Sequence, residues 1–319
     1  MFKNILKLVN SYIKFRLSRS LRTIHSDNVE HYQNVAIFAY DRIGLEIQMH
    51  GIYEKNILYG LSKILFNQID SRNSICLDIG ANIGNHSLIF SKYFQSVYSF
   101  EPNSDIFDLL HINTKRLNNI KIFNFGASDK DESVTMQTNQ KSSMGGMSVK
   151  EKESDIIPDI EVFNASMKNM DNFFRDYPVD ADISFIKIDV EGFELNTLKG
   201  LRNTLNKYHP VIGFEQHQDD FFNNENIISS QSIDQIRQCG YSFFYEIRIY
   251  PGWISGLKIQ QKYIKKISHI IELILFAAPK IKVQLASIHK FERKKYPMII
   301  ASSELLEELT VDMGQLYNR

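Results

Sequence analysis

The sequence has 319 residues, of which 43% are hydrophobic and 23% are charged. This balance is typical of a folded globular protein and excludes a largely disordered chain. Lysine plus arginine and aspartate plus glutamate both number 37, so the formal net charge is zero. Because general nucleic-acid binders carry a basic excess, this charge argues against nucleic acid as the main substrate.

The first 24 residues have apolar side chains at helical spacing and lysines on the opposite side. The apolar positions are Phe2, Ile5, Leu6, Val9, Ile13 and Leu17, and the lysines are Lys3, Lys7 and Lys14. We expect an amphipathic helix that packs on the domain or on a second subunit, or that lies at a membrane surface, with a disordered end as the remaining alternative. No segment is long and apolar enough to span a bilayer; the best candidate, 270–278, is too short and contains Glu272.

Residues 33–50 alternate loosely, and Asp41–Gly44 within them predicts a hairpin turn. A helical pattern then runs through Ile57–Leu65. From residue 74 onward, short apolar runs alternate with helical stretches. Strands are expected at 74–79, 97–101, 120–125, 183–190, 211–215, 241–249 and 298–301, helices at 84–94, 106–117, 167–177, 195–205 and 233–239, and a polar loop with Ser142, Ser143, Gly145 and Gly146.

This alternation predicts an α/β fold, because strands separated by helices pair in parallel through right-handed crossovers and form a doubly wound sheet. We expect residues 1–30 to form an N-terminal helix or extension and residues 31–249 to form the core. Residues 250–296 are expected as an insertion that contacts the substrate, a second subunit or a membrane. Residues 297–319 then form the last strand and a tail.

The segment Asp78–Gly84 takes a buried strand through a turn with two glycines into a helix. Glycine lacks a Cβ atom, so a cofactor can lie against the backbone at the carboxyl end of the strand. The spacing of Gly80 and Gly84 is G-x-x-x-G, which differs from the G-x-G-x-x-G fingerprint of dinucleotide binding. A plain strand–helix turn is the alternative interpretation.

Acidic residues end the next two strands. Glu101 can accept hydrogen bonds from both hydroxyls of a ribose, a device that NAD enzymes also use, so it indicates a ribose-containing cofactor without choosing one. Asp129, in the loop after the following strand, can accept from an adenine amine; a solvated turn aspartate is the alternative.

The segment Phe185–Glu194 crowds two acids and Lys187 at the end of a strand that should be central. Charged groups there are costly unless they have partners, so Asp189 and Glu191 are candidate site residues. Glu194 is expected to place a favourable charge at a helix N-terminus.

Together these segments resemble the FkbM family of S-adenosylmethionine-dependent methyltransferases. The resemblance rests on Gly51–Glu54, Asp78–Gly84, Phe100–Asn103, Ala127–Asp129 and Ile186–Glu194. It implies a class I methyltransferase fold, a Rossmann-like sheet of seven strands with the last antiparallel. It also implies S-adenosyl-L-methionine as cofactor and O-methylation, often of sugar hydroxyls. The cofactor-binding candidates are Glu54, for which the resemblance is the sole basis, and Asp78, Gly80, Asn82, Gly84, Glu101, Asn103, Ser128 and Asp129.

Methyl transfer to a hydroxyl needs positioned reactants and a group that accepts a proton. The candidates are Asp189, Glu191, Glu215 and His217, and the last two are expected to face the same crevice as Asp189. Histidine is the most natural base because it titrates near neutrality. A divalent ion held by Asp189, Glu215 and His217 is a second option, and a surface-loop histidine is the alternative for His217.

We therefore expect an O-methyltransferase that acts on a small-molecule or glycan hydroxyl, as a homo-oligomer in the cytoplasm or at the inner membrane surface. Cys76 and Cys239 lack metal-site spacing and fit a reducing compartment. The alternatives are a nucleotide-cofactor enzyme such as a dehydrogenase, a non-catalytic scaffold with this fold, and a methyltransferase that acts on RNA or protein.

Overall fold

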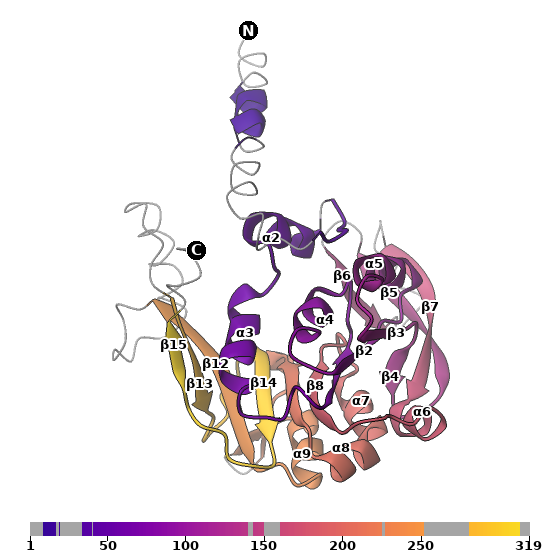
Figure 1. The fold of residues 1–319 in the computed structure, drawn as a ribbon, viewed down its shortest axis with the longest axis vertical. Coiled ribbons are helices and arrows are strands. Elements are labelled where there is room, and N and C mark those ends of the chain that lie inside the picture. Colours follow the sequence, from indigo (N-terminus) through magenta and orange to yellow (C-terminus); the bar gives the residue numbers. More distant parts are fainter. Residues whose placement is uncertain are drawn as a thin grey trace. The chain divides into compact units, whose positions relative to one another are not determined.

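The computed structural model describes residues 9–16, 19, 34–39, 41–139, 143–149, 160–224, 227–251 and 281–312 (Figure 1). Ser142, most of the predicted insertion (252–280), the tail after residue 312 and much of the N-terminal segment lie outside these residues. The chain divides into two compact units, one of residues 1–55 and 136–162 and the other of residues 56–135 and 163–319. No helix among the described residues has the length and apolar character needed to cross a membrane.

In the first unit, residues 9–16 are helical and α2 spans Arg42–His50. The hairpin turn predicted at Asp41–Gly44 is wrong, because this segment begins a helix. The Asp41 side chain caps it by accepting a hydrogen bond from the Ile43 backbone N–H at 3.1 Å. Gly51, at φ 79°, ends the helix, and its N–H donates to the carbonyl of Ile47 at 2.7 Å.

Two antiparallel strands replace the polar loop that was predicted around residues 142–146. β5 spans Glu132–Asn139 and β6 spans Ser143–Val149. Met136 lies opposite Val149, and Thr138 lies opposite Met147. The prediction of a loop is wrong for Ser143, Gly145 and Gly146, because pairing with a neighbouring strand supplies backbone hydrogen bonds that side-chain polarity does not reveal.

The second unit is built on a mixed sheet with nine strands among its described residues, in the order β15-β13-β12-β14-β9-β8-β1-β2-β3 (Figure 1). β1, β2, β3, β8 and β9 are parallel, and β14 is antiparallel to both of its neighbours. The bounds are β1 Ile75–Ile79, β2 Ser96–Phe100, β3 Ile120–Phe123, β8 Ile183–Ile188, β9 Val211–Gln216, β12 Phe243–Pro251, β13 Ile281–Ser287, β14 Tyr296–Ser302 and β15 Thr310–Asp312.

This sheet confirms the predicted fold class. Its seven core strands follow the order β3-β2-β1-β8-β9-β14-β12, and the last of them in the chain, β14, is antiparallel. β13 and β15 extend the sheet beyond β12. The end of the predicted insertion is therefore part of the sheet, because residues 281–287 pair with β12 along their whole length.

The helices mostly fall where the sequence predicts them, with shifted bounds. The helical pattern predicted at Ile57–Leu65 forms two elements, α3 and the π-helix η1. The helix predicted at 195–205 is likewise interrupted at Leu201 and forms α7 and α8. The first residues of the helix predicted at 167–177 belong to the strand β7 instead. The bounds are α3 Lys55–Gly60, η1 Leu61–Leu65, α4 Asn85–Phe90, α5 Ser104–Thr114, α6 Met170–Asp176, α7 Glu194–Gly200, α8 Arg202–Tyr208, η2 Gln218–Asp220 and α9 Gln231–Gln238. The remaining strands are β4 Gly126–Ser128, β7 Ile160–Asn169, β10 Phe222–Asn224 and β11 Ile227–Ser229.

Apolar side chains cover both faces of the sheet, so its central strands are fixed from two sides. All five residues of β1 are buried. Ile186 of β8 belongs to a core cluster that also contains Leu198 of α7 and Ile233 of α9. The preceding residue, Phe185, points to the other face and contacts Phe66, with ring centroids 5.2 Å apart.

Candidate functional site

The carboxyl ends of the parallel strands bring the sequence-predicted acids to one edge of the sheet. Asp78 lies in β1 and pairs across the sheet with Lys187 of β8, one residue before each strand ends. Glu101 follows β2, Asp189 follows β8 and Glu215 lies near the end of β9. Parallel pairing places these ends together, and α/β sheets bind ligands at this edge.

Gly80 begins the loop between β1 and α4 with a left-handed backbone, at φ 78°. A Cβ atom added there would lie 1.8 Å from the carbonyl oxygen of Asp189. The Asp189 N–H in turn donates to the carbonyl of Ile79 at 3.1 Å. Glycine is thus required because the loops after β1 and β8 touch through their backbones.

Lys187 is a buried cation that ties this edge together. Its side chain is 2% exposed, and its Nζ donates to the carbonyl of Gly80 at 2.7 Å. The same Nζ lies 3.4 Å from Asp78 Oδ1 and 3.4 Å from Asp189 Oδ2. Ser87 of α4 donates to the other oxygen of Asp78 at 2.6 Å. The partners of Asp78 therefore come from β8 and α4 and offset the cost of burying its carboxylate, whereas the Asp189 side chain is 36% exposed.

Glu101 is 1% exposed and is held by two backbone groups of neighbouring loops. Its Oε2 accepts from the Asn82 N–H at 3.0 Å, and its Oε1 accepts from the Asn103 N–H at 2.9 Å. Burial raises the pKa of Glu101 to about 7, although the two backbone hydrogen bonds act in the opposite direction. A carboxylate oxygen has two lone pairs, so each oxygen still has an acceptor position.

Asn82 and Asn103, both predicted to bind the cofactor, also shape the loops around Glu101. Asn82 has a left-handed backbone (φ 51°), and its side chain accepts from the Ile83 N–H at 2.7 Å. Asn103 caps α5 by accepting from the N–H groups of Asp105 and Ile106. Gly84, at φ 91°, closes the loop; a Cβ atom there would meet Leu110 at 2.8 Å.

Ser128 ends β4 and Asp129 follows it, and α7 anchors the Asp129 side chain. Ser128 is fully buried, and its hydroxyl donates to Asp129 Oδ1 at 3.3 Å. Asn196 of α7 donates to the same carboxylate oxygen at 3.2 Å. Glu54 belongs to the first unit and has a left-handed backbone (φ 53°) just before α3.

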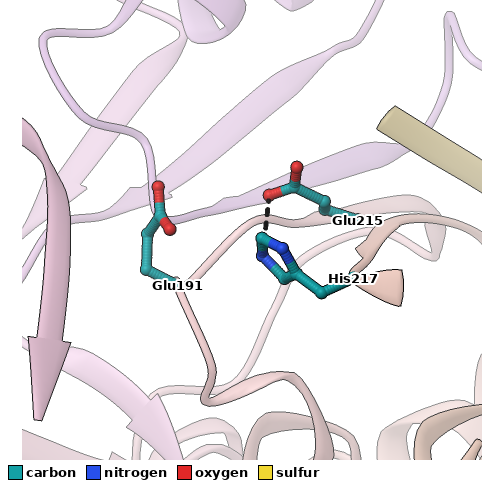
Figure 2. A group of neighbouring side chains, drawn as sticks. All are labelled: Glu191, Glu215 and His217. Atoms are coloured by element: carbon teal, nitrogen blue, oxygen red, sulfur yellow. Dashed lines mark ion pairs between the residues drawn. The ribbon is translucent and has the colours of Figure 1, made fainter. Parts of the chain in front are cut away.

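A second group of side chains gathers where β8 and β9 end. Figure 2 shows Glu191, from the loop after β8, facing Glu215 and His217 from the end of β9. One oxygen or nitrogen atom from each lies within 4.8 Å of the others. His217 Nε2 is 3.5 Å from Glu215 Oε2. The structure thus brings Glu191, rather than Asp189, together with Glu215 and His217, because Asp189 Oδ2 faces Lys187.

Lys295 completes this group from a distant part of the chain. It immediately precedes β14, whose first residue, Tyr296, pairs with Gln216 of β9. The Lys295 Nζ lies 2.5 Å from Glu215 Oε1, on the oxygen that His217 does not contact. Burial lowers the pKa of Lys295, but the hydrogen bond to Glu215 and the nearby acidic charges outweigh burial and leave that pKa raised.

The loop that carries Glu191 is closed by Glu194. Glu191 has a left-handed backbone at φ 50° and Gly192 has one at φ 102°. The carboxylate of Glu194 accepts from the Gly192 N–H at 3.1 Å and from the Val190 N–H at 3.4 Å. Burial, followed by the charges of Asp189 and Glu215, raises the pKa of Glu191 to about 7.

Sequence reasoning assigned no role to Lys187 and missed Lys295. A lysine inside an otherwise apolar strand is a signal for Lys187, because such a charge needs buried partners. The signal for Lys295 is weaker. It lies at the end of the predicted insertion, and it reaches the site because β14 runs antiparallel and so begins at the edge where β9 ends.

A polar hollow at the opposite edge of the sheet contains none of these candidates. Its volume is about 710 Å³, and Ser74, Asp182, His209 and Ser302 are among its lining residues. These residues lie at the amino ends of β1, β8 and β9 and at the carboxyl end of β14. The acids singled out above therefore belong to the other edge.

The carboxyl-edge residues fit an adenosine-containing cofactor by their chemistry. Glu101 offers a vacant acceptor position on each oxygen to two hydroxyl donors. The neighbouring loop has glycines at Gly80 and Gly84, so no Cβ atom stands at these two positions beside the strand end. These acceptor atoms suit a ribose better than a phosphate, because a carboxylate repels an anion.

Comparison with known proteins gives a family match and one curated relative. The family model described as the Methyltransferase FkbM domain matches residues 78–243, just over half of the chain. Hexuronic acid methyltransferase AglP of Haloferax volcanii is 30% identical over 149 residues, which cover 44% of this chain and 55% of AglP. The match therefore spans about half the length of that relative.

Among solved structures, methyltransferase FkbM of Methylobacillus flagellatus KT is similar at 13% identity and a TM-score of 0.35, covering 87% of this chain and 59% of that one. Fibrillarin of Aeropyrum pernix, solved with S-adenosyl-L-methionine bound, is similar at 12% identity and a TM-score of 0.35, covering 59% and 64%. These TM-scores are too low for either structure to support an inference about this chain.

Proposed function

The chain belongs to the FkbM family of S-adenosylmethionine-dependent methyltransferases, and on that premise we propose that it methylates a hydroxyl group of a sugar. The observation that carries the proposal is the pairing of two groups at one edge of the sheet. Glu101 and the glycine loop offer a place for adenosine, and Glu191, Glu215 and His217 offer a place where a hydroxyl loses its proton.

In this proposal the cofactor lies across the ends of β1 and β2. The Glu101 carboxylate accepts hydrogen bonds from the ribose hydroxyls, and the Gly80–Gly84 loop lets the ligand approach the backbone. Asn82 and Asn103 hold the Glu101 carboxylate through their N–H groups. Ser128 and Asp129 border the adenine, as they do in the family resemblance, and Glu54 keeps its assignment on that resemblance alone.

S-adenosylmethionine supplies a methyl group that is already activated, so the protein has to position the acceptor and handle one proton. His217 is the natural acceptor of that proton, and Glu215 orients its imidazole across 3.5 Å. Alternatively, Glu191, Glu215 and His217 would hold a divalent cation that would lower the pKa of the acceptor hydroxyl. Asp189, which faces Lys187, positions the loop that carries Glu191.

A sugar acceptor is supported by the curated relative, whose name is hexuronic acid methyltransferase. The neutral overall charge also favours a small or glycan acceptor over RNA. We therefore propose a hexuronic acid or a related sugar as the acceptor class.

The test is methyl transfer with a chemically defined product. The purified chain is incubated with S-adenosylmethionine carrying a labelled methyl group and with glycosides of neutral sugars and hexuronic acids. We expect label in a sugar product that survives mild alkali, because a methyl ether is stable where a methyl ester of the uronate carboxyl is hydrolysed. Label that is lost in alkali, or that enters only RNA or protein, would contradict the proposal.

A matched pair of histidine variants tests the proposed proton-handling group. His217→Ala should lower the transfer rate by roughly 10²–10⁴-fold and leave S-adenosylhomocysteine binding intact. His209→Asn is the control, because His209 lies at the opposite edge of the sheet and has a left-handed backbone that asparagine tolerates. Equal methyl-transfer rates for the two variants would show that His217 takes no part in the reaction.

A further inference from the structure

We propose that Lys295 is a positioning residue for methyl transfer, because it holds the Glu215 carboxylate in the orientation in which that carboxylate meets His217. This inference rests on the proposed function, in which His217 accepts the proton of the acceptor hydroxyl. Lys295 lies beyond residue 243, where the match to the family ends, so the match assigns it no role.

The Glu215 carboxylate meets its two partners through different oxygen atoms. The Lys295 Nζ lies 2.5 Å from Oε1, and His217 Nε2 lies 3.5 Å from Oε2 (Figure 2). A charge-assisted hydrogen bond to one oxygen of a planar carboxylate restricts its rotation, and so restricts the place of the other oxygen. The position of Lys295 therefore sets where Glu215 meets the imidazole.

Both ends of this ion pair start from backbone that the sheet fixes. Gln216, which separates Glu215 from His217, pairs with Tyr296, the residue after Lys295. The side chains of Gln216 and Tyr296 are buried. The antiparallel pairing of β9 with β14 therefore places the Lys295 and Glu215 side chains next to each other at the edge of the sheet.

Glu215 needs a cation because other acids stand close to it. Its side chain is 14% exposed, and one of its oxygen atoms lies within 4.8 Å of an oxygen of Glu191. Lys187 faces Asp189 instead. Burial, followed by the charges of Asp189 and Glu215, raises the pKa of Glu191, whereas the charge of Lys295 acts in the opposite direction. Without Lys295, repulsion between Glu191 and Glu215 would turn the Glu215 carboxylate out of its present direction.

The ion pair between Lys295 and Glu215 adds little to the stability of the fold. The Lys295 side chain is 56% exposed, and an ion pair that water reaches contributes little to the free energy of unfolding. Loss of Lys295 should therefore change the rate of the reaction and leave the folded state intact. Circular dichroism melting of the Lys295 variants checks this expectation.

The Lys295→Met variant of the full-length protein tests the inference, with labelled S-adenosylmethionine and the same glycosides of neutral sugars and hexuronic acids. We expect kcat to fall by about tenfold or more, because the proton acceptor is no longer held in place. The KM for S-adenosylmethionine should stay unchanged. Lys295→Arg should keep most of the rate, because arginine retains the charge. Lys294→Met is the control, since the adjacent Lys294 pairs with Glu246 at 3.0 Å.

The pH profile of kcat distinguishes positioning from a structural role. The charged and titratable groups that face one another here are Asp189, Glu191 and Glu194 after β8, Glu215 and His217 at the end of β9, Asp220 of η2, Lys187 of β8, and Lys295. Removal of one positive charge makes its neighbours keep their protons to higher pH. The acidic limb of the profile should therefore move to higher pH in Lys295→Met and stay in place in Lys295→Arg.

A double variant shows whether Lys295 acts through His217. In a His217→Ala background, Lys295→Met should change kcat by less than about twofold, because the group that Lys295 positions is absent. An equal loss of kcat in both backgrounds would overturn the proposal. So would a Lys295→Met variant whose rate and pH profile match those of Lys294→Met.

Nuclear magnetic resonance of the His217 imidazole gives a readout that needs no acceptor. Its signals, identified by their absence in His217→Ala, should change in Lys295→Met and not in Lys294→Met. Unchanged signals in Lys295→Met would overturn the proposal. Failure of the proposed function reads out separately, as a wild-type protein that puts no label into a sugar.

Discussion

Two carboxylates at the site, Glu101 and Glu191, owe their raised pKa values to burial first, yet their partners differ. Glu101 accepts two backbone hydrogen bonds from loops that must be folded for it to be held. Glu191 instead faces other acids, whose charges raise its pKa further. Residues with such shifts are concentrated at functional sites, because binding and catalysis require charged groups that water does not fully solvate.

Binding of S-adenosylhomocysteine should strengthen as pH rises through about 7. Burial raises the pKa of Glu101 to about 7, from an ordinary value of 4.5. Its contribution to stability is therefore fully present below pH 4.5 and is lost as pH rises through 7. In the proposed complex the ribose hydroxyls would donate to the charged carboxylate, so ligand binding should favour its ionisation and release a proton near neutral pH.

Isothermal titration from pH 5.5 to 8.5, in two buffers of different ionisation enthalpy, measures both the affinity and the proton release. The Glu101→Gln variant should bind S-adenosylhomocysteine more weakly, and its affinity should not change between pH 6 and 8. A wild-type affinity that is flat across this range would show that Glu101 does not contact the ligand.

At the scale of elements, the site depends on contact between the loop after β1 and the loop after β8. Lys187 bonds to the Gly80 carbonyl, and the Asp189 N–H bonds to Ile79. Gly200 makes a similar approach in α7, where a Cβ atom would lie 1.9 Å from the carbonyl of Ser128. At both glycines the neighbouring backbone leaves no room for a methyl group, so a side chain there would force the adjoining segments apart.

Gly80→Ala should damage both the fold and cofactor binding, whereas Gly240→Ala should affect the fold alone. Both residues have left-handed backbones, at φ 78° and 88°, so alanine costs about 1–2 kcal/mol at each. Only Gly80 also meets a backbone atom, the Asp189 carbonyl, whereas Gly240 faces open space. The clash should add about 1–3 kcal/mol at Gly80.

Urea unfolding gives the free energies of unfolding, and titration calorimetry gives the affinity for S-adenosylhomocysteine. We expect Gly80→Ala to lose at least about tenfold in affinity and Gly240→Ala to keep the wild-type value. Equal unfolding free energies for the two variants would mean that the contact between the loops carries no strain.

At the scale of the whole molecule, the two units present different surfaces. The second unit contains the sheet, its core and every candidate site residue except Glu54. In the first unit, helical residues 9–16 expose apolar side chains on one face, with Val9 51% and Ile13 48% exposed. Lys14 and Arg16 in the same segment add positive charge. An apolar face with basic neighbours is typical of a helix that lies on an anionic membrane.

We therefore expect the full chain to co-float with vesicles that contain phosphatidylglycerol at low salt, and less at high salt. Ile13→Glu should abolish flotation, because Ile13 lies on the apolar face and is 48% exposed. Ser11→Glu makes the same change of charge about half a turn away and should float nearly as wild type does. If Ile13→Glu and Ser11→Glu float equally, the apolar face does not contact the membrane, and contact with a second subunit becomes the better explanation.

The sequence by itself determined the parallel sheet and the edge at which its acids meet. Apolar runs and helical spacing are local properties, and parallel strands necessarily bring Asp78, Glu101 and Glu215 to one edge. The prediction was wrong where the same residue types are common both in turns and at helix N-termini. Asp41–Gly44 has turn-forming residues, but the Asp41 side chain caps a helix.

Only the tertiary structure decided which residues stand together at the site. Lys187 draws Asp189 away from the group that Glu191, Glu215 and His217 form. Lys295 joins that group because β14 pairs with β9 across about 80 residues of sequence. Which of these side chains come into contact depends on strand order and register. Strand order and register depend in turn on contacts between distant segments, which a periodic pattern in the sequence does not reveal.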